Sequence, residues 1–459
     1  MSRIALVLAL LSIAGNTFAQ GPFDSQPGAG HASGLFAQGG AVRLTLADAI
    51  SRGLETSHRI AEIKAREEGA RAAVTFAELA KRPIVSASAG YSRTNHVDEF
   101  SVPQPNGTFV VVYPDIPNNF VTRVGLQWPI FTSGRTDALE RAAEAEASAV
   151  GAEVEAARAD LRFEIVRAYW AAVTAREAVR VLEESAARAE AQLGDARQRF
   201  KVGLIPPNEV SSLEAQRSRE QAQFFEAGNI RESALIDLRR LIGVPYNTVI
   251  DLVDPLEQPA AATATQLQQL VKHALDSRPE RKAMTLRLGG LEARHLAALT
   301  GNKPTINLTG GVDYANPNPR HFPRKGEWRE SWDVGVNVNW NFFDSGRTKA
   351  QAAEVSAAAA ATRERIAEFD SVVAADVQQR ILDVETGHAM INAARDAVRS
   401  ATEARRVVAD RFAAGVATST DLLVAQVALL EAELARTRSL AAVRLAEARL
   451  ERSLGTPRP

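Results

Sequence analysis

The sequence contains no cysteine, and this absence excludes several kinds of chemistry. Without a thiol there is no disulfide framework, no thiolate metal site, no catalytic cysteine and no acylated N-terminal cysteine to act as an anchor. Acidic and basic side chains balance to a formal net charge of -1 over 459 residues, which provides no basic surface for nucleic acid. There is no G-x-x-x-x-G-K-[ST] loop, no H-x-x-x-H pair among the seven histidines, and no nucleophile beside a base. We therefore predict a protein that is not an enzyme and holds no metal or cofactor.

Long apolar runs are also absent, except at the N-terminus. The stretch MSRIALVLALLSIAGNTFAQ joins a basic start, an apolar run and small residues, which predicts a signal peptide over residues 1–19. A membrane anchor is the alternative, but the run is shorter than the ~20 residues of a spanning helix. Residues 20–43 are rich in Gly, Ser, Gln and Ala and are predicted to be a disordered leader. Because no later stretch suits a spanning helix, any membrane crossing is expected to use strands.

An internal repeat organises the rest of the chain. The stretch W-P-I-F-T-S-G-R-T at 128–136 recurs 212 residues later as W-N-F-F-D-S-G-R-T at 340–348. The motif R-F-x-x-G, which begins at Arg199, recurs at Arg411 with the same offset. Such a period indicates two copies of one structural unit. We assign the first unit to residues 44–254 and the second to 255–457.

Each unit contains two stretches in which apolar and polar residues alternate, the pattern of strands with two different faces. We expect strands at about 84–92, 119–131, 305–314 and 332–343. Each has about the ten residues that a tilted strand needs to cross a bilayer. Aromatic residues near the strand ends predict a membrane girdle, and they are Tyr91, Phe120, Trp128, Tyr314, Trp332 and Trp340. A soluble sandwich is the alternative, but it does not explain why aromatics gather at the ends.

Four strands cannot close a membrane barrel, because the smallest barrels have about eight. An open sheet edge cannot exist in lipid, where its amides would lack partners. Several chains must therefore share one barrel, and three copies would supply twelve strands; two or four copies are also physically possible. The strands are predicted to join long helices through two hinges, which comprise Ser133, Gly134, Arg135, Ser345, Gly346 and Arg347.

The remaining stretches predict long helices. The first unit is expected to begin with helices that break at Ser57 or His58 and end before Pro83. Long helices are predicted at 136–200 and 348–410, and return helices at 208–241 and 420–454, with apolar seams spaced alternately four and three residues. Glycines 203 and 415 suit the turns that follow the long helices. The predicted N-caps of the return helices are Asn208 and either Ser419 or Thr420.

The two units, the S-G-R hinges and the R-F-x-x-G tips together resemble the TolC-like outer membrane efflux family. The resemblance covers residues 44–457 and implies a mixed fold of α-helices and membrane strands. It implies a homotrimer with a 12-stranded barrel in the outer membrane lipid and a coiled-coil tunnel in the periplasm of a Gram-negative cell. It also implies a periplasmic adaptor protein and a proton-driven or ATP-driven inner-membrane pump, as in tripartite efflux or type I secretion. The alternative function is a periplasmic coiled-coil protein without a pore, which salt would extract without detergent.

The resemblance also implies roles for residues at the helical tips. The positions expected to dock the adaptor are Arg199, Gly203, Leu204, Arg411, Gly415 and Val416. The family's acidic entrance corresponds to Glu209 and Asp421, although both acids also suit the positive end of a helix. Three positions depart from the family's closed entrance: Val424 replaces a second acid, Phe412 lacks a hydroxyl, and Ala417 replaces a basic residue.

Overall fold

The computed structural model describes residues 42–257 and 267–455. The predicted signal peptide, and the predicted leader up to residue 41, lie outside the described residues. The leader was predicted to extend to residue 43, and this end is wrong. Val42 and Arg43 belong to strand β1 (Val42–Leu44), where the amide of Val42 donates to the carbonyl of Val249 over 2.8 Å. Residues 42–43 and 247–251 form a small unit, and the other described residues form a second unit.

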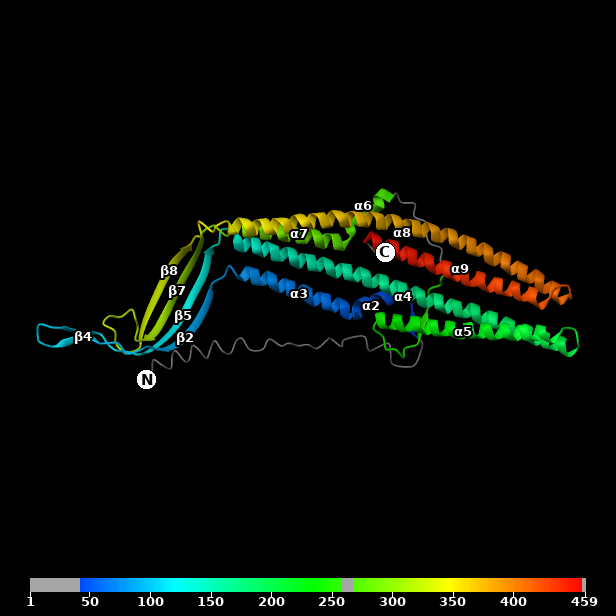
Figure 1. Cartoon of the computed structure of the whole chain (residues 1–459), viewed down its shortest axis with the longest axis horizontal. Helices are drawn as coiled ribbons and strands as arrows, with labels where there is room; N and C mark the ends of the chain where they lie inside the picture. The colour runs from blue at the N-terminus through cyan, green and yellow to red at the C-terminus, as the bar shows by residue number, and fades with distance from the viewer. Residues whose placement is uncertain (1–41, 258–266, 456–459) are drawn as a thin grey trace. The chain divides into compact units, whose positions relative to one another are not determined.

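The larger unit contains one four-stranded antiparallel sheet (Figure 1). Its strands are β2 (Ile84–Arg93), β5 (Asn118–Phe131), β7 (Thr305–Asn316) and β8 (Arg329–Asn339). Their order is β2-β5-β7-β8, so the two repeats meet where β5 pairs with β7. Strands β2 and β8 are the edges, and each has a neighbour on only one side among the described residues.

The last strand is shorter at its end than predicted. Strand β8 ends at Asn339 rather than near residue 343, because its last partner is Thr305, the first residue of β7. The loop between β2 and β5 also contains an unexpected hairpin, formed by β3 (Phe100–Pro103) and β4 (Phe109–Tyr113). Gly107 has a φ of 81°, a value that glycine adopts without strain, and its amide donates to the Gln104 carbonyl over 3.0 Å to close the turn.

The helices form two long hairpins, α4 with α5 and α8 with α9 (Figure 1). The α4 and α8 helices have 67 residues each, which corresponds to about 100 Å. Ser57 separates α2 from α3 and caps α3, because its hydroxyl accepts from the amide of Ile60. The helices are α2 (Leu46–Thr56), α3 (His58–Leu79), α4 (Arg135–Lys201), α5 (Pro207–Leu241), α6 (Leu267–Ser277), α7 (Pro279–Ala298), α8 (Arg347–Ala413) and α9 (Ser419–Leu454).

The core runs along α4, which packs against α3, α5, α7 and α9. Its buried side chains number 22 and are mostly alanine and β-branched residues, as the predicted seam requires. Helix α8 has the same length but only 7 buried residues, because it packs mainly against α6, α7 and α9. The repeat-related helices therefore occupy different environments: α4 lies centrally, and α8 lies at one border of the single chain. Among the described residues, no helix combines the length and apolar character that a membrane crossing requires.

Candidate functional site

The sheet has one apolar face, and among the described residues no other segment covers it. Val334, Val336 and Val338 of β8 lie on it with exposed fractions of 69%, 61% and 62%. The cross-strand register brings Val124 opposite Val312, and Val312 opposite Trp332, on the same face. A continuous exposed apolar surface of this kind marks contact with lipid or another apolar partner.

The opposite face carries a network of ion pairs that the sequence alone did not predict. The guanidinium of Arg123 on β5 lies 2.7 Å from Asp313 on β7 and 3.0 Å from Asp333 on β8. Gly311 leaves room for this guanidinium, since a Cβ there would lie 2.7 Å from Arg123 Nη2. Arg320, from the β7–β8 loop, also donates to Asp333 over 3.1 Å. The charged face is therefore tied across three strands and one loop.

The predicted aromatic residues lie at both ends of the sheet. Tyr91 and Phe120 are cross-strand partners at the loop end, with ring centroids 4.9 Å apart. Tyr314 stacks at 5.0 Å on Trp328, which lies in the β7–β8 loop and was not predicted. Trp332 lies two residues further along β8 than the partner of Tyr314.

At the helical end, two repeat-related tryptophans anchor the turns that enter the sheet. The indole of Trp128 donates to the carbonyl of Lys81 over 2.9 Å, and that of Trp340 donates to the carbonyl of Asn302 over 3.0 Å. Both rings remain at least 40% exposed. A ring with an apolar body and a satisfied polar tip suits the border between lipid and water.

Both hinges contain two successive residues with left-handed backbone. Ser133 and Gly134 have φ values of 54° and 82°, and Ser345 and Gly346 have 55° and 87°. The turn directs the chain from the strand end into the long helix. In the second hinge, Asp344 accepts from the amides of Gly346 and Thr348 over 3.0 and 2.8 Å. The arginines 135 and 347 begin the two helices.

Replacing Gly346 with alanine is expected to destabilise the protein by about 1–2 kcal/mol, because a Cβ is unfavourable in left-handed backbone. The measurement is the thermal unfolding midpoint, followed by circular dichroism in detergent. The matched control is Gly69→Ala in α3, where a Cβ meets open space and helix propensity favours alanine by about 1 kcal/mol. The two variants should shift the midpoint in opposite directions; a shift of the same sign would contradict the role assigned to the hinge.

The tips of the two hairpins have the same backbone geometry. Gly203 and Gly415 both have a φ of 76°. Leu204 and Val416 donate their amides to the carbonyls of Arg199 and Arg411, each over 2.9 Å, which closes the helix ends. Their side chains are 74% and 68% exposed, so each tip presents an apolar residue to its surroundings.

The two predicted N-caps are wrong. Helix α5 begins at Pro207 with Pro206 as N-cap, because proline is already fixed in the backbone conformation of a first helical turn. Asn208 therefore lies inside the helix. Helix α9 is capped by Thr418, which forms a capping box with Asp421 three residues later. This box decides between neighbouring hydroxyl residues, because only Thr418 has an acid at the required spacing.

A contact between the hairpins joins the two tips. The guanidinium of Arg199 lies 4.8 Å from the ring centroid of Phe412, and its Nη1 donates to the Phe412 carbonyl over 3.4 Å. The sequence identified Phe412 as a residue that lacks a hydroxyl. The structure shows that the Phe412 ring instead forms a cation–π contact with the Arg199 guanidinium.

The two acids that were predicted to line the entrance lie in the first turns of their helices. Asp421 accepts from the amide and hydroxyl of Thr418 over 2.9 and 2.7 Å. Glu209 lies in the first turn of α5 and is partly buried. Val424 is 64% exposed one turn after Asp421. Within the single chain, Asp421 thus places a negative charge at the positive N-terminal end of α9 and stabilises it.

Comparison with known proteins decides the family. A model of the outer membrane efflux protein family matches residues 49–244 and 270–456. The chain belongs to this family. It is 28% identical to Protein CyaE of Bordetella pertussis over 304 residues, a match that spans 66% of this chain and 60% of CyaE. It is 23% identical to Outer membrane protein TolC of Vibrio cholerae over 389 residues, which span 84% of this chain and 85% of TolC.

Solved structures show the same fold. The CusC channel aligns with a TM-score of 0.76 over 92% of this chain and 96% of CusC, at 14% identity. The MtrE channel of Neisseria gonorrhoeae aligns with a TM-score of 0.73 over 90% of this chain and 89% of MtrE, at 21% identity. The predicted family and the two-repeat fold are confirmed, and the chain is an outer membrane efflux protein.

The capping box predicts how the efflux protein responds to acid. Hydrogen bonds from the Thr418 backbone and hydroxyl, aided by the charge of Arg411, hold the pKa of Asp421 below its ordinary 3.8. A lowered folded-state pKa means that the carboxylate stabilises the start of α9 above the ordinary pKa, and that this contribution is lost as the pH falls through the folded value. Asp421→Asn should therefore lower the unfolding midpoint at about pH 6, and the difference should shrink as the pH falls and disappear once Asp421 is protonated in the folded state.

The control for this effect is Glu209→Gln, the equivalent change in the first repeat. Pro206 has no hydroxyl and forms no capping box with Glu209, so this variant should show a smaller shift at about pH 6. Equal shifts for the two variants would mean that the box contributes nothing specific.

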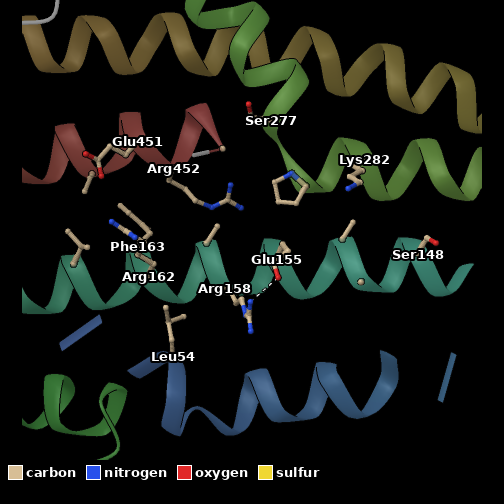
Figure 2. Close-up of a pocket in the computed structure, with 17 residues that line it drawn as sticks. Leu54, Ser148, Glu155, Arg158, Arg162, Phe163, Ser277, Lys282, Glu451 and Arg452 are labelled. Atoms are coloured by element: carbon tan, nitrogen blue, oxygen red, sulfur yellow. Dashed lines mark hydrogen bonds and ion pairs between the residues drawn. The ribbon is translucent and has the colours of Figure 1, made fainter. Parts of the chain in front are cut away.

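Two grooves between helices were not predicted. The first, of about 560 Å³, is lined by α4 and by residues of α2, α6, α7 and α9 (Figure 2). The side chains of Arg162 on α4 and Lys282 on α7 line it and have no hydrogen bond or ion pair among the described residues. Figure 2 shows these two side chains apart, on different helices, rather than converging. The second, of about 660 Å³, lies between α4, α5 and α9 and is lined mostly by apolar side chains. Neither groove has the convergent polar groups of a ligand site.

Proposed function

We propose that three copies of this chain form the outer membrane exit channel of a tripartite efflux or type I secretion system, which conducts solutes and catalyses no reaction. The observation that carries the proposal is the sheet: its apolar face is exposed, its polar face is charged, and both of its edge strands are open. In lipid, the apolar face would contact hydrocarbon and the polar face would line the pore. The open edges β2 and β8 would pair between copies, because unpaired amides are too costly in hydrocarbon.

The helices support the same assembly. Helix α8 lies at one border of the chain and exposes Val372, Leu382 and Met390. At the other border, α3 exposes Phe76, and α5 exposes Phe225 and Ile230. In a ring of copies, the border with α8 would pack against the next copy's border with α3 and α5. Apolar side chains on both borders would then be removed from water, which favours association.

The helical tips would dock the partners. A periplasmic adaptor protein is proposed to bind the tips through Leu204 and Val416, whose side chains are exposed beside the glycine turns. Energy would come from an inner-membrane pump, driven by protons or ATP. The three copies of Asp421, together with those of Glu209, would surround the periplasmic entrance and favour cations.

Conductance in planar lipid bilayers tests the channel. The purified protein should form discrete channels, and glutaraldehyde should link it into trimers in detergent. Extraction from membranes by salt alone, with no conductance, would support the coiled-coil protein without a pore. For the entrance, Asp421→Ala should weaken cation preference. The control is Thr418→Ala, which removes the helix cap but keeps the Asp421 charge and should therefore keep the cation preference. Unchanged cation preference and unchanged block by divalent ions in Asp421→Ala would remove this residue from the gate.

A further inference from the structure

The internal repeat places the same two residues at both hairpin tips. Arg199 and Phe200 end the first long helix, and Arg411 and Phe412 occupy the equivalent positions 212 residues later. Two crossed contacts are therefore possible between a first and a second hairpin: Arg199 with Phe412, and Arg411 with Phe200. Each would join an arginine of one hairpin to the ring of the other.

Only one of these contacts is made within the chain. Arg199 stacks on Phe412 at 4.8 Å. The side chain of Arg411 is exposed, and among the described residues it has no hydrogen bond, ion pair or ring contact; its charge acts only at longer range, on Asp421. Phe200 is 44% exposed. The tip therefore contains a second guanidinium and a second ring that are not stacked on one another, and they are of the same types as the pair that is formed.

The order of the helices explains why the second contact is not made within one chain. In the chain, α5 packs on α4, α4 packs on α9, and α9 packs on α8. The first hairpin thus meets the second through α4 and α9, a long helix and a return helix. The repeat-related interface would join α8 to α5, but these two helices lie on opposite borders of the chain. Only a second copy can supply the missing neighbour.

We propose that Arg411 stacks on Phe200 of the neighbouring copy, so that three contacts within chains and three between chains form a ring of six at the tips. The inference rests on the proposed trimer and adds to it a residue-specific contact between copies. The partner that contacts the exposed Arg411 is thus a second copy of this chain.

Farther from the tip, the interface within the chain and the interface proposed between copies have different residues. The arginine and the phenylalanine at the tip are the residues that both interfaces share. Within the chain, Arg188 of α4 pairs with Glu433 of α9 at 3.3 Å. The repeat-related positions are Ser400 and Gln221, which cannot form an ion pair. The interface between copies would therefore lack this charge pair but keep the arginine and the phenylalanine at the tip.

Crosslinking between introduced cysteines tests the contact without background, because the chain has no cysteine of its own. The full-length protein is made with Arg411→Cys and Phe200→Cys together, and treated in native membranes with a short bismaleimide. The matched variant carries Arg199→Cys and Phe412→Cys. On denaturing gels, the first variant should convert mostly to covalent trimer, and the second should remain a monomer with an internal crosslink.

The outcomes separate this inference from the proposed function. If glutaraldehyde links the wild type into trimers, but the 411/200 variant gives no more intermolecular product than Arg411→Cys alone, the tip contact is overturned and the trimer remains. If glutaraldehyde gives only monomers, the proposed trimer fails, and the tip contact fails with it. A covalent trimer from the 199/412 variant would also contradict the assignment, because that pair lies within one chain.

Discussion

Replacing Val336 with arginine is expected to abolish assembly of the protein in the outer membrane. Val336 lies in the middle of β8, is 61% exposed on the apolar face, and pairs in register with Leu308. An arginine at the middle of the bilayer costs about 2–4 kcal/mol, so in the proposed trimer three copies would cost roughly 6–12 kcal/mol. We expect the variant to be absent from the outer membrane fraction, as measured by immunoblot and by crosslinked trimer.

The control is the adjacent residue. Asn337 lies on the polar face of the same strand, pairs with Asn307, and donates its side-chain amide to Thr309 over 3.1 Å. Asn337→Arg adds the same side chain one residue away and should assemble normally, with altered conductance only. If Val336→Arg assembles and Asn337→Arg does not, the faces of the sheet are assigned in reverse. If both assemble, the sheet does not lie in lipid.

The sequence predicts most of this architecture because the decisive signals are periodic. Alternation along each strand separates Arg123 and Asp313 from the valines, and the register then brings the two charges together. The repeat fixes the two hinges and the two tips, since the same local residues adopt the same backbone at both. These features depend on residues that are close in the sequence, so they can be predicted without knowledge of the tertiary fold.

Other features were accessible in the sequence but require finer rules. The spacing of Thr418 and Asp421 is that of a capping box, and Pro206-Pro207 excludes Asn208 as a cap. The valine run of β4 is a strand signal inside a loop.

A third group depends on contacts between distant segments. Arg320 reaches Asp333 from a loop, Trp328 stacks on Tyr314, and Arg199 stacks on Phe412. No local pattern encodes these pairs, because each depends on how two segments pack together. Only the three-dimensional structure therefore identifies which residues form these three pairs.

Removing the Arg199 guanidinium is expected to loosen the entrance of the channel. A cation–π contact at an exposed site contributes about 0.5–1 kcal/mol, so the three copies of the proposed trimer would contribute about 1.5–3 kcal/mol. If the contact with Phe412 holds the two hairpins together in the closed state, Arg199→Ala should increase the ratio of open to closed channels about ten- to a hundredfold. Single-channel recordings in planar bilayers measure this ratio directly.

Two further variants separate the ring contact from the charge. Lys201→Ala removes a positive charge from the same helix end, where the lysine is exposed and has no ion pair among the described residues, and should leave the ratio nearly unchanged. Phe412→Ala should reproduce Arg199→Ala, and the double variant should add little to either, because both remove the same contact. Fully additive effects would mean that the two side chains act independently. An effect of Lys201→Ala as large as that of Arg199→Ala would assign the result to the loss of charge at the tip.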